Sequence, residues 1–368
     1  MPELGNNTKD RLSAARAKNR RFIERHRRKI LVAWTLLLLC LMFVAGETIL
    51  RWAIPYRIDY YTGVKVSNRM IKYPFGEMPF NSHGYPDREW DNDDPRTRVG
   101  FVGDSVTMGF GAGFGYRYSE IISDARKDRY YMNFGGAGED GVADDRAIEN
   151  LIAIAQRFRL KKLVYGMNLN DILPSHATGG VADAPMRTAK SFVAKYIDPL
   201  RSRSYVYNYF RTKAKIVATR LGYGYHGDEM FELHPMRNSV IVGQTVDRIN
   251  KLGLRLKQEG VEFCVVVFPY EMQISRDAAE KYRQYGIQWS SELLTGEPQT
   301  MILRHLAPDI VAVNLVHAFN SNVSKPDDIQ IGTYFVFNKG DALDWNHPNR
   351  DGHMLIAEYL LKNAARCL

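Results

Sequence analysis

The sequence is poor in cysteine, with only Cys40, Cys264 and Cys367 among its 368 residues. One lies in a long apolar run and another in a stretch typical of a core strand, so we expect no disulfide framework. No spacing of Cys and His resembles a zinc site, and we expect neither a metal nor another cofactor. Internal repeats and low-complexity tracts are also missing, and 45% hydrophobic with 25% charged residues is an ordinary globular balance.

Charge is missing from the stretch 30–46, ILVAWTLLLLCLMFVAG. At about 1.5 Å per residue this run is close to the lower limit for a membrane-spanning helix. A buried core helix would have a polar face, and this stretch has none. A cleaved signal peptide is the other alternative, but its basic and apolar regions would be unusually long. We therefore predict an uncleaved transmembrane signal anchor over 30–50.

Basic residues gather before this apolar run. Residues 1–29 hold ten Lys and Arg against three acids, a net charge of +7, while the rest of the chain is close to neutral. The positive-inside rule predicts a basic cytoplasmic tail over 1–29 and a periplasmic or extracellular domain after Arg51, anchored in the inner membrane. Nucleic acid is not expected as a partner, because the anchor separates the tail from that domain.

Acidic residues are scarce between Arg187 and Arg220, where nine Lys and Arg stand against Asp198 alone and aromatic residues are interleaved. This composition predicts a helical basic insertion over about 175–238. A solvated insertion, a lid, and a face that lies on anionic lipid or an acidic polymer all fit it. The sequence leaves these alternatives open.

Strands and helices alternate after residue 97. Expected strands are 99–103, 130–134, 162–166, 261–269 and 310–315, and expected helices are 118–126, 144–157, 239–258 and 353–365. Such alternation predicts an α/β fold with a parallel sheet covered on both faces, whose active site lies at the carboxyl ends of the strands. The irregular, aromatic-rich stretch 51–96 is predicted to be a connector packed on the domain of 97–368.

A Gly-Asp-Ser turn follows the first of these strands and places Ser105 at its carboxyl end. A serine hydroxyl needs a base to become a good nucleophile, and the base is usually a His oriented by a carboxylate. Asp344 and His347 lie three residues apart in a loop before the last helix. That spacing lets the carboxylate reach one ring nitrogen and leaves the other for Ser105. Structural roles are expected for His353 and Asp104.

Four blocks of the sequence resemble, in order and context, those of the SGNH (GDSL-type) hydrolases: GDS at 103–105, the glycine-rich NFGGAG at 133–138, NLND at 168–171 and DWNH at 344–347. The resemblance implies a three-layer α/β/α fold with a flavodoxin-like parallel sheet over roughly 97–365. It also implies a catalytic triad of Ser105, Asp344 and His347.

An oxyanion hole is the second feature that the resemblance implies. Its donors would be the N–H groups of Ser105 and Gly138 and the side-chain amide of Asn170. Glycine in the second block lets a backbone N–H approach a substrate closely. The glycine at 135 or 136 could take the place of Gly138, and Asn168 is a rival for Asn170.

These observations predict a membrane-anchored serine esterase of the SGNH type. Its expected partners are the membrane, through residues 30–50, and an ester-bearing carbohydrate or lipid of the cell envelope, with O-acetyl groups as the expected esters. Two alternatives stay open. One is an O-acyltransferase that uses the same triad on an exopolysaccharide, and the other is a non-catalytic glycan-binding scaffold. The acyl group, the acceptor and the oligomeric state are not fixed by the sequence.

Overall fold

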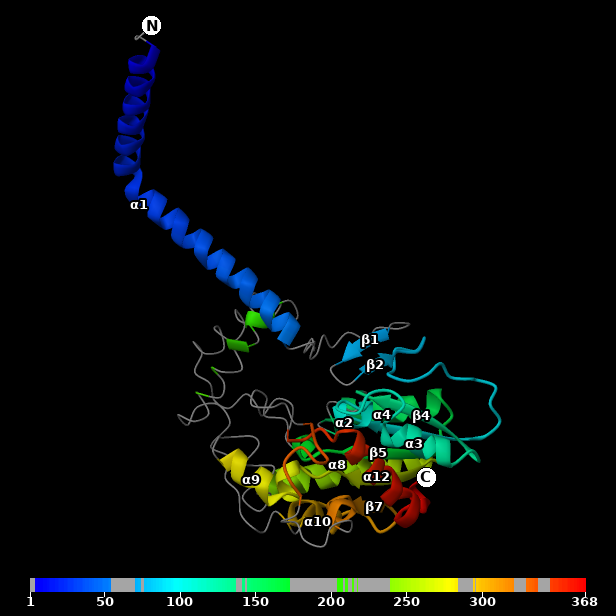
Figure 1. The fold of residues 1–368 in the computed structure, drawn as a ribbon. Helices are drawn as coiled ribbons and strands as arrows, with labels where there is room; N and C mark the ends of the chain where they lie inside the picture. Colours follow the sequence, from blue (N-terminus) through cyan, green and yellow to red (C-terminus); the bar gives the residue numbers. More distant parts are fainter. Residues whose placement is uncertain are drawn as a thin grey trace.

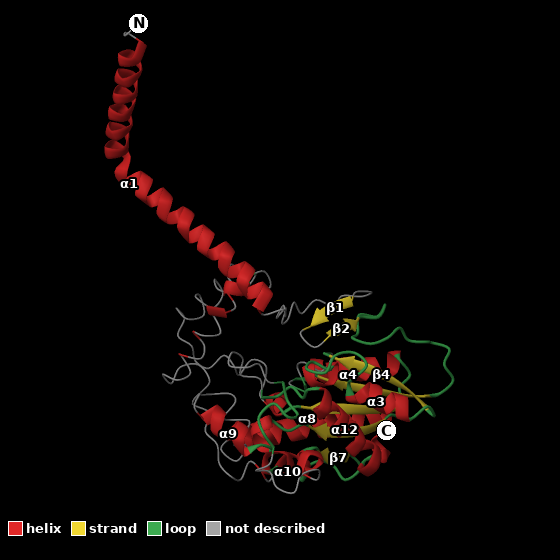
Figure 2. Ribbon diagram, in the orientation of Figure 1, coloured by secondary structure: helices red, strands yellow, loops and turns green. Residues whose placement is uncertain are grey.

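The computed structural model describes residues 4–53, 70–73, 76–136, 141–142, 144–172, 204–207, 209–210, 214, 217, 239–283, 294, 296–320, 329–336 and 345–368. Within them lie one long N-terminal helix, a small hairpin and an α/β domain built around a parallel sheet (Figures 1 and 2). Most of the predicted basic insertion lies outside these residues.

The central sheet has five parallel strands. They are β3 (Thr97–Gly103), β4 (Arg129–Gly135), β5 (Lys162–Met167), β6 (Glu262–Val267) and β7 (Val311–Asn314). Their order across the sheet is β4-β3-β5-β6-β7, with every neighbouring pair parallel. This is the flavodoxin-like order 2-1-3-4-5, so the predicted fold class is confirmed.

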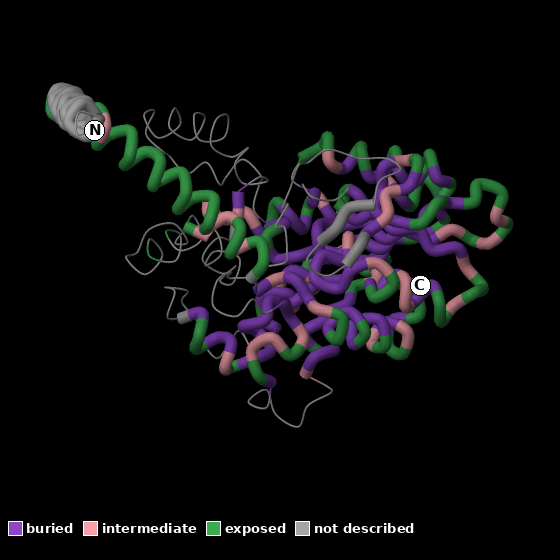
Figure 3. Tube along the Cα trace, turned by 45° about the horizontal axis from the view of Figure 1, so that its top comes forward, coloured by how far each residue is buried: buried purple, intermediate pink, exposed green. Residues whose placement is uncertain are grey.

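Helices cover both faces of the sheet, as Figure 2 shows. On one face lie α3 (Tyr118–Ala125), α11 (Val316–Asn320) and α12 (Arg350–Asn363), and on the other lie α4 (Asp145–Arg157) and α8 (Ser239–Gln258). Side chains alternate between the faces because the period of a strand is two. Phe101 packs under α3, whereas its neighbour Val102 belongs to the core on the other side. Burial is concentrated in these layers, as Figure 3 shows.

The sequence pattern missed several short elements. The described residues add α9 (Arg276–Arg283), α10 (Glu297–Leu303) and α11, each a helix of eight residues or fewer. The last helix also begins three residues earlier than expected, at Arg350. The cause is Asn349, whose side chain accepts the N–H of Gly352 at 3.0 Å and caps the helix there.

The N-terminal part begins with α1 (Leu4–Ala53), in which the 27-residue stretch His26–Trp52 is long and apolar enough to span a membrane. The following stretch, expected to be irregular, contains an antiparallel hairpin of β1 (Met70–Tyr73) and β2 (Gly76–Pro79). Beyond it, Tyr85 and Trp90 are buried in the core cluster that contains α4.

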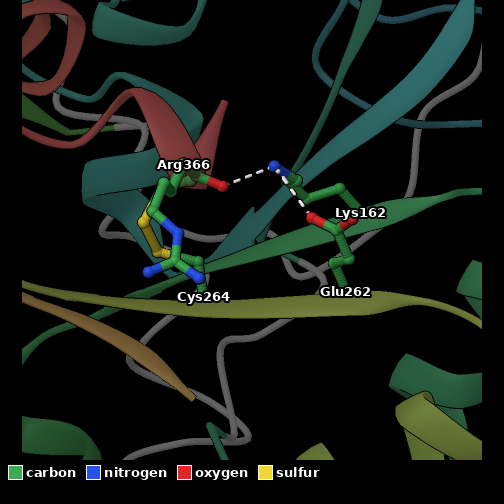
Figure 4. Close-up of a disulfide and its surroundings, with 5 residues drawn as sticks. Lys162, Glu262, Cys264 and Arg366 are labelled. Carbon is green, nitrogen blue, oxygen red and sulfur yellow. Dashed lines mark hydrogen bonds and ion pairs between the residues drawn. A yellow bond between two sulfur atoms is a disulfide. The ribbon is translucent and has the colours of Figure 1, made fainter. Parts of the chain in front are cut away.

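A disulfide joins Cys264 to Cys367, so the expectation of no disulfide was wrong (Figure 4). Cys264 lies in β6 and Cys367 in the 3-10 turn Ala365–Cys367 after α12, and both side chains are buried. Beside the bond, the ammonium of Lys162 donates to the carbonyl of Arg366. The bond therefore holds the turn after α12 to β6 covalently.

Candidate active site

The Gly-Asp-Ser turn lies where β3 ends and the short helix α2 (Ser105–Met108) begins. Asp104 caps this helix, because its carboxylate accepts the N–H of Val106 at 2.9 Å. Gly103 is required by close packing, since a Cβ there would lie 2.3 Å from Thr107 Oγ1 and 2.5 Å from the carbonyl oxygen of Gly166. The turn therefore holds Ser105 at the carboxyl end of the strand.

Ser105 and His347 meet at this edge of the sheet. The hydroxyl oxygen of Ser105 lies 2.8 Å from Nε2 of His347, although 242 residues separate them in the chain. Both side chains are only 8% exposed. The two groups are within the distance at which a proton passes from a hydroxyl to an imidazole.

The loop that carries His347 is held from both sides. The backbone carbonyl of His347 accepts the N–H of Val336 at 2.9 Å, and the carbonyl of Trp345 accepts the N–H of Glu271 at 2.7 Å. The ring of Phe110 lies 4.4 Å from the imidazole, centroid to centroid. These contacts fix the position of the ring before any substrate arrives. Asp344, the predicted third member of the triad, lies outside the described residues.

The two glycines that were rivals for the oxyanion hole are already engaged. The N–H of Gly135 donates to the side chain of Asn133 at 2.7 Å, and the N–H of Gly136 donates to the carbonyl of Gly103 at 2.9 Å. Neither N–H can point at a substrate while it makes these bonds. Gly138 lies outside the described residues.

The two asparagines of the third block have different environments. Asn168 is fully buried, and its side chain donates to Asp104 at 3.4 Å and accepts the N–H of Leu169 at 2.9 Å. Asn170 is exposed in the 3-10 turn Leu169–Ile172. Only Asn170 therefore has a side chain that faces solvent. Asp171 supports the turn by accepting the N–H of Asn168 at 3.0 Å.

Burial sets the protonation of two groups beside the pair. Burial raises the pKa of the Asp104 carboxyl, while the N–H of Val106 and the nearby His347 oppose the rise. Burial, together with Arg117 and His347, lowers the pKa of His353 to about 3. The ring of His353 is therefore neutral near pH 7, and its Nδ1 accepts the N–H of Tyr118 at 3.2 Å. A structural role for His353 agrees with this contact.

A buried cation near the nucleophile was missed by the sequence reasoning. Arg117 is fully buried and donates to the carbonyl of Pro86, to the carbonyl of Met108 at 3.3 Å and to Asp87 at 3.3 Å. Met108 is the last residue of α2, so this guanidinium ties the 80–96 segment to the helix of Ser105. Charged side chains are mostly exposed, and no sequence signal marked this one as internal.

Within the described part of the chain, no cluster suited to a metal ion is found, and one cavity lies away from this edge. Among the described residues, no three His, Cys, Asp or Glu side chains are grouped so that they could hold a metal ion. A cavity of about 410 Å³ is lined by Lys162, Glu262 and Val311. These residues begin β5, β6 and β7, so this cavity lies at the edge opposite to Ser105.

No protein-family model and no curated protein matches the chain. Solved structures with a similar fold include a member of the lipolytic protein G-D-S-L family from Veillonella parvula, with a TM-score of 0.35 and 12% identity over 73% of this chain and 99% of the other. A salicylyl-acyltransferase from a tetracycline biosynthetic pathway has a TM-score of 0.31 and 11% identity, over 76% of this chain and 57% of the other. At these scores the likenesses carry no weight for function.

Proposed function

We propose that this chain is a membrane-anchored serine esterase of the SGNH type. The observation that carries the proposal is the 2.8 Å distance between the hydroxyl of Ser105 and Nε2 of His347. The pair lies at the carboxyl edge of a parallel sheet, where active sites of such folds are found. A scaffold that only binds has no need for a serine and a histidine in proton-sharing contact.

In the proposed reaction, Ser105 attacks the carbonyl carbon of an ester while His347 takes the hydroxyl proton. Asp344 would orient the imidazole and stabilise its charge. The C–O bond to the alcohol then breaks, and His347 returns the proton to the leaving alkoxide. Water attacks the acyl-serine in the second half, giving the carboxylic acid and free Ser105. A sugar hydroxyl in place of water would make the same machinery an O-acyltransferase.

The donors for the oxyanion are proposed to be the N–H groups of Ser105 and Gly138 and the amide of Asn170. Support comes from the helix start at Ser105, because the first N–H groups of a helix have no acceptor within it. The exposed position of Asn170 and the engaged N–H groups of Gly135 and Gly136 support the rest.

The location of the domain is proposed from α1 and the disulfide. Within the 27 helical residues His26–Trp52, which extend about 40 Å, an 18-residue window has a mean hydropathy of 2.3. The basic residues before it favour a cytoplasmic N-terminus. A buried disulfide fits a domain on the oxidising side of the membrane. There the substrates within reach are O-acetylated carbohydrates of the envelope and lipid esters.

A fluorophosphonate probe is expected to label the folded full-length chain at Ser105, as mapped by peptide mass spectrometry. Phosphonylation requires a serine activated by a base, so His347→Asn should slow labelling about 10²-fold or more. His305→Asn is the matched control, because His305 is exposed and its Nδ1 bonds only the nearby carbonyl of Met301. Folded protein without a label at Ser105 would favour the non-catalytic scaffold.

The two asparagines should separate catalysis from stability. Asn170→Ala is expected to lower kcat for an acetyl ester about 10²–10³-fold with little change in melting temperature, because it removes one oxyanion donor. Asn168→Ala should mainly destabilise the fold, since its buried amide bonds Asp104 and the backbone. Kinetics and thermal melting of both variants test this. The assignment of Asn170 is wrong if its variant keeps full kcat.

A further inference from the structure

A helical piece of the basic insertion is joined to the end of α1 (Figure 1). Residues 205–207, 209–210, 214 and 217 of this piece are described, and all are helical. The carboxylate of Glu47 accepts a hydrogen bond from the hydroxyl of Ser204. It also accepts the backbone N–H groups of Tyr205 at 3.0 Å and Val206 at 3.4 Å. Glu47 therefore fixes where this helical piece begins.

The same joint has a cation–π contact and an apolar contact. The guanidinium carbon of Arg51 lies 5.4 Å from the centre of the Tyr205 ring. Val206 packs so closely on α1 that a Cβ added at Gly46 would lie 3.1 Å from its Cγ2. The piece is thus packed on the last two turns of α1, where the apolar stretch of that helix ends.

The outer face of the piece is apolar and uncovered. Phe210 is 65% exposed and Val217 is 53% exposed, with exposed Ala214 between them. Positions i, i+4 and i+7 share one face of a helix, so these three side chains form a stripe. In the last two turns of α1, Ile49 and Trp52 are also exposed, on a different side of that helix from Glu47. Apolar side chains gathered in this way mark a surface that is covered by something other than water.

The charge of the sequence that surrounds these residues indicates what covers the stripe. Residues 201–220 contain six Lys and Arg and no acid. A helix with an apolar stripe and basic flanks is typical of segments that lie in the interface of a bilayer with anionic headgroups. The end of a membrane-spanning α1 lies at that same depth, because its apolar stretch stops at Trp52. The stripe and the bilayer would therefore form one continuous surface.

We propose that the described residues 204–207, 209–210, 214 and 217 lie in the lipid–water interface of the leaflet through which α1 leaves the membrane. Phe210, Ala214 and Val217 face the acyl chains, and the basic residues contact anionic headgroups. The inference rests on the proposed membrane anchorage and does not depend on the esterase activity. Its consequence is mechanical: the catalytic domain is held against the leaflet by two elements rather than tethered by one helix.

Site-directed spin labelling of the full-length chain in liposomes tests this inference. Phe210→Cys in a Cys40→Ala background carries a nitroxide, and the disulfide of Cys264 and Cys367 stays closed. The vesicles contain phosphatidylcholine and phosphatidylglycerol. In them, the collision rate of this label with water-soluble Ni(II)EDDA should be at most about one third of the rate for a label at Leu254→Cys, which is exposed on α8. Adding Glu47→Ala should raise the collision rate of the label at position 210, because this change releases the helical piece from α1.

Each remaining outcome has a separate meaning. A label on native Cys40 tests α1 alone: free access of Ni(II)EDDA to it overturns the anchorage itself. If Cys40 is shielded while the label at 210 is as accessible as the one at 254, the anchorage stands and the interface inference fails. Equal shielding at 210 in vesicles of phosphatidylcholine alone overturns the role given to anionic headgroups. Hydrolysis of a soluble ester should be the same in all these variants.

Discussion

Ser105→Ala is expected to lower kcat/KM for hydrolysis of p-nitrophenyl acetate about 10³-fold or more, because the variant cannot form the acyl-serine. The side chain is small and 8% exposed, so its removal leaves the fold intact. Melting temperature and the disulfide should be unchanged. Ser82→Ala is the matched control, since the Ser82 hydroxyl bonds only Glu89 at the surface and should have no effect on rate.

The double variant makes this test sharper. A nucleophile and its base act in one step, so removing both should cost about as much as removing either. Ser105→Ala with His347→Ala is therefore expected to be no slower than the slower single variant. Losses that multiply would mean that the 2.8 Å contact between them is not used in catalysis. Full activity of Ser105→Ala would leave the esterase proposal without its nucleophile.

Much of the central fold was predictable because its strands are buried on both faces. The stretch VEFCVVVFP is apolar at successive positions, which is typical of an inner parallel strand, and it contains β6. The turn after β3 was predictable for a related reason, because glycine beside a short polar residue interrupts such a run. Together, these two signals predict that Ser105 lies at the carboxyl edge of the sheet.

The network around Arg117 could not be predicted, since it depends on segments far apart in sequence. Its guanidinium bonds residues 86, 87 and 108 as well as the nearby Glu120, and a pair with Glu120 at i, i+3 does not by itself indicate a buried charge. The proposed oxyanion donors could not be predicted uniquely for the same reason. Gly135 and Gly136 fit the sequence argument as well as Gly138 does. Only hydrogen bonds to Asn133 and Gly103 remove the first two from consideration.

The disulfide was missed because spacing gives no signal for it. Cys264 and Cys367 are 103 residues apart, and each lies in a different element. Their Cα atoms come to 5.5 Å only because the chain returns to β6 after α12. Two buried cysteines in a chain with three are equally compatible with inert core thiols.

Removing this disulfide should have the largest effect on stability. Cys264→Ala with Cys367→Ala is expected to lower the free energy of unfolding by about 2–5 kcal/mol, because the bond closes a loop of about 100 residues in the unfolded chain. For a domain of this size the melting temperature should fall by roughly 5–15 °C. Thermal unfolding in detergent, followed by circular dichroism, measures the change. Cys40→Ala should leave it unchanged, since this free cysteine lies in α1.

Chemical reduction of the disulfide distinguishes the effect of losing the bond from the effect of losing the packing of the two cysteine side chains. Dithiothreitol should destabilise the wild type by a similar amount and leave the double variant unaffected, because only the wild type has a bond to reduce. Thiol alkylation should count one free cysteine in the oxidised chain and three in the reduced chain. The same count, made on protein taken from cells, tests the proposed location. A domain on the oxidising side should have one reactive thiol, whereas three would place Cys264 and Cys367 in a reducing compartment and contradict the proposed topology.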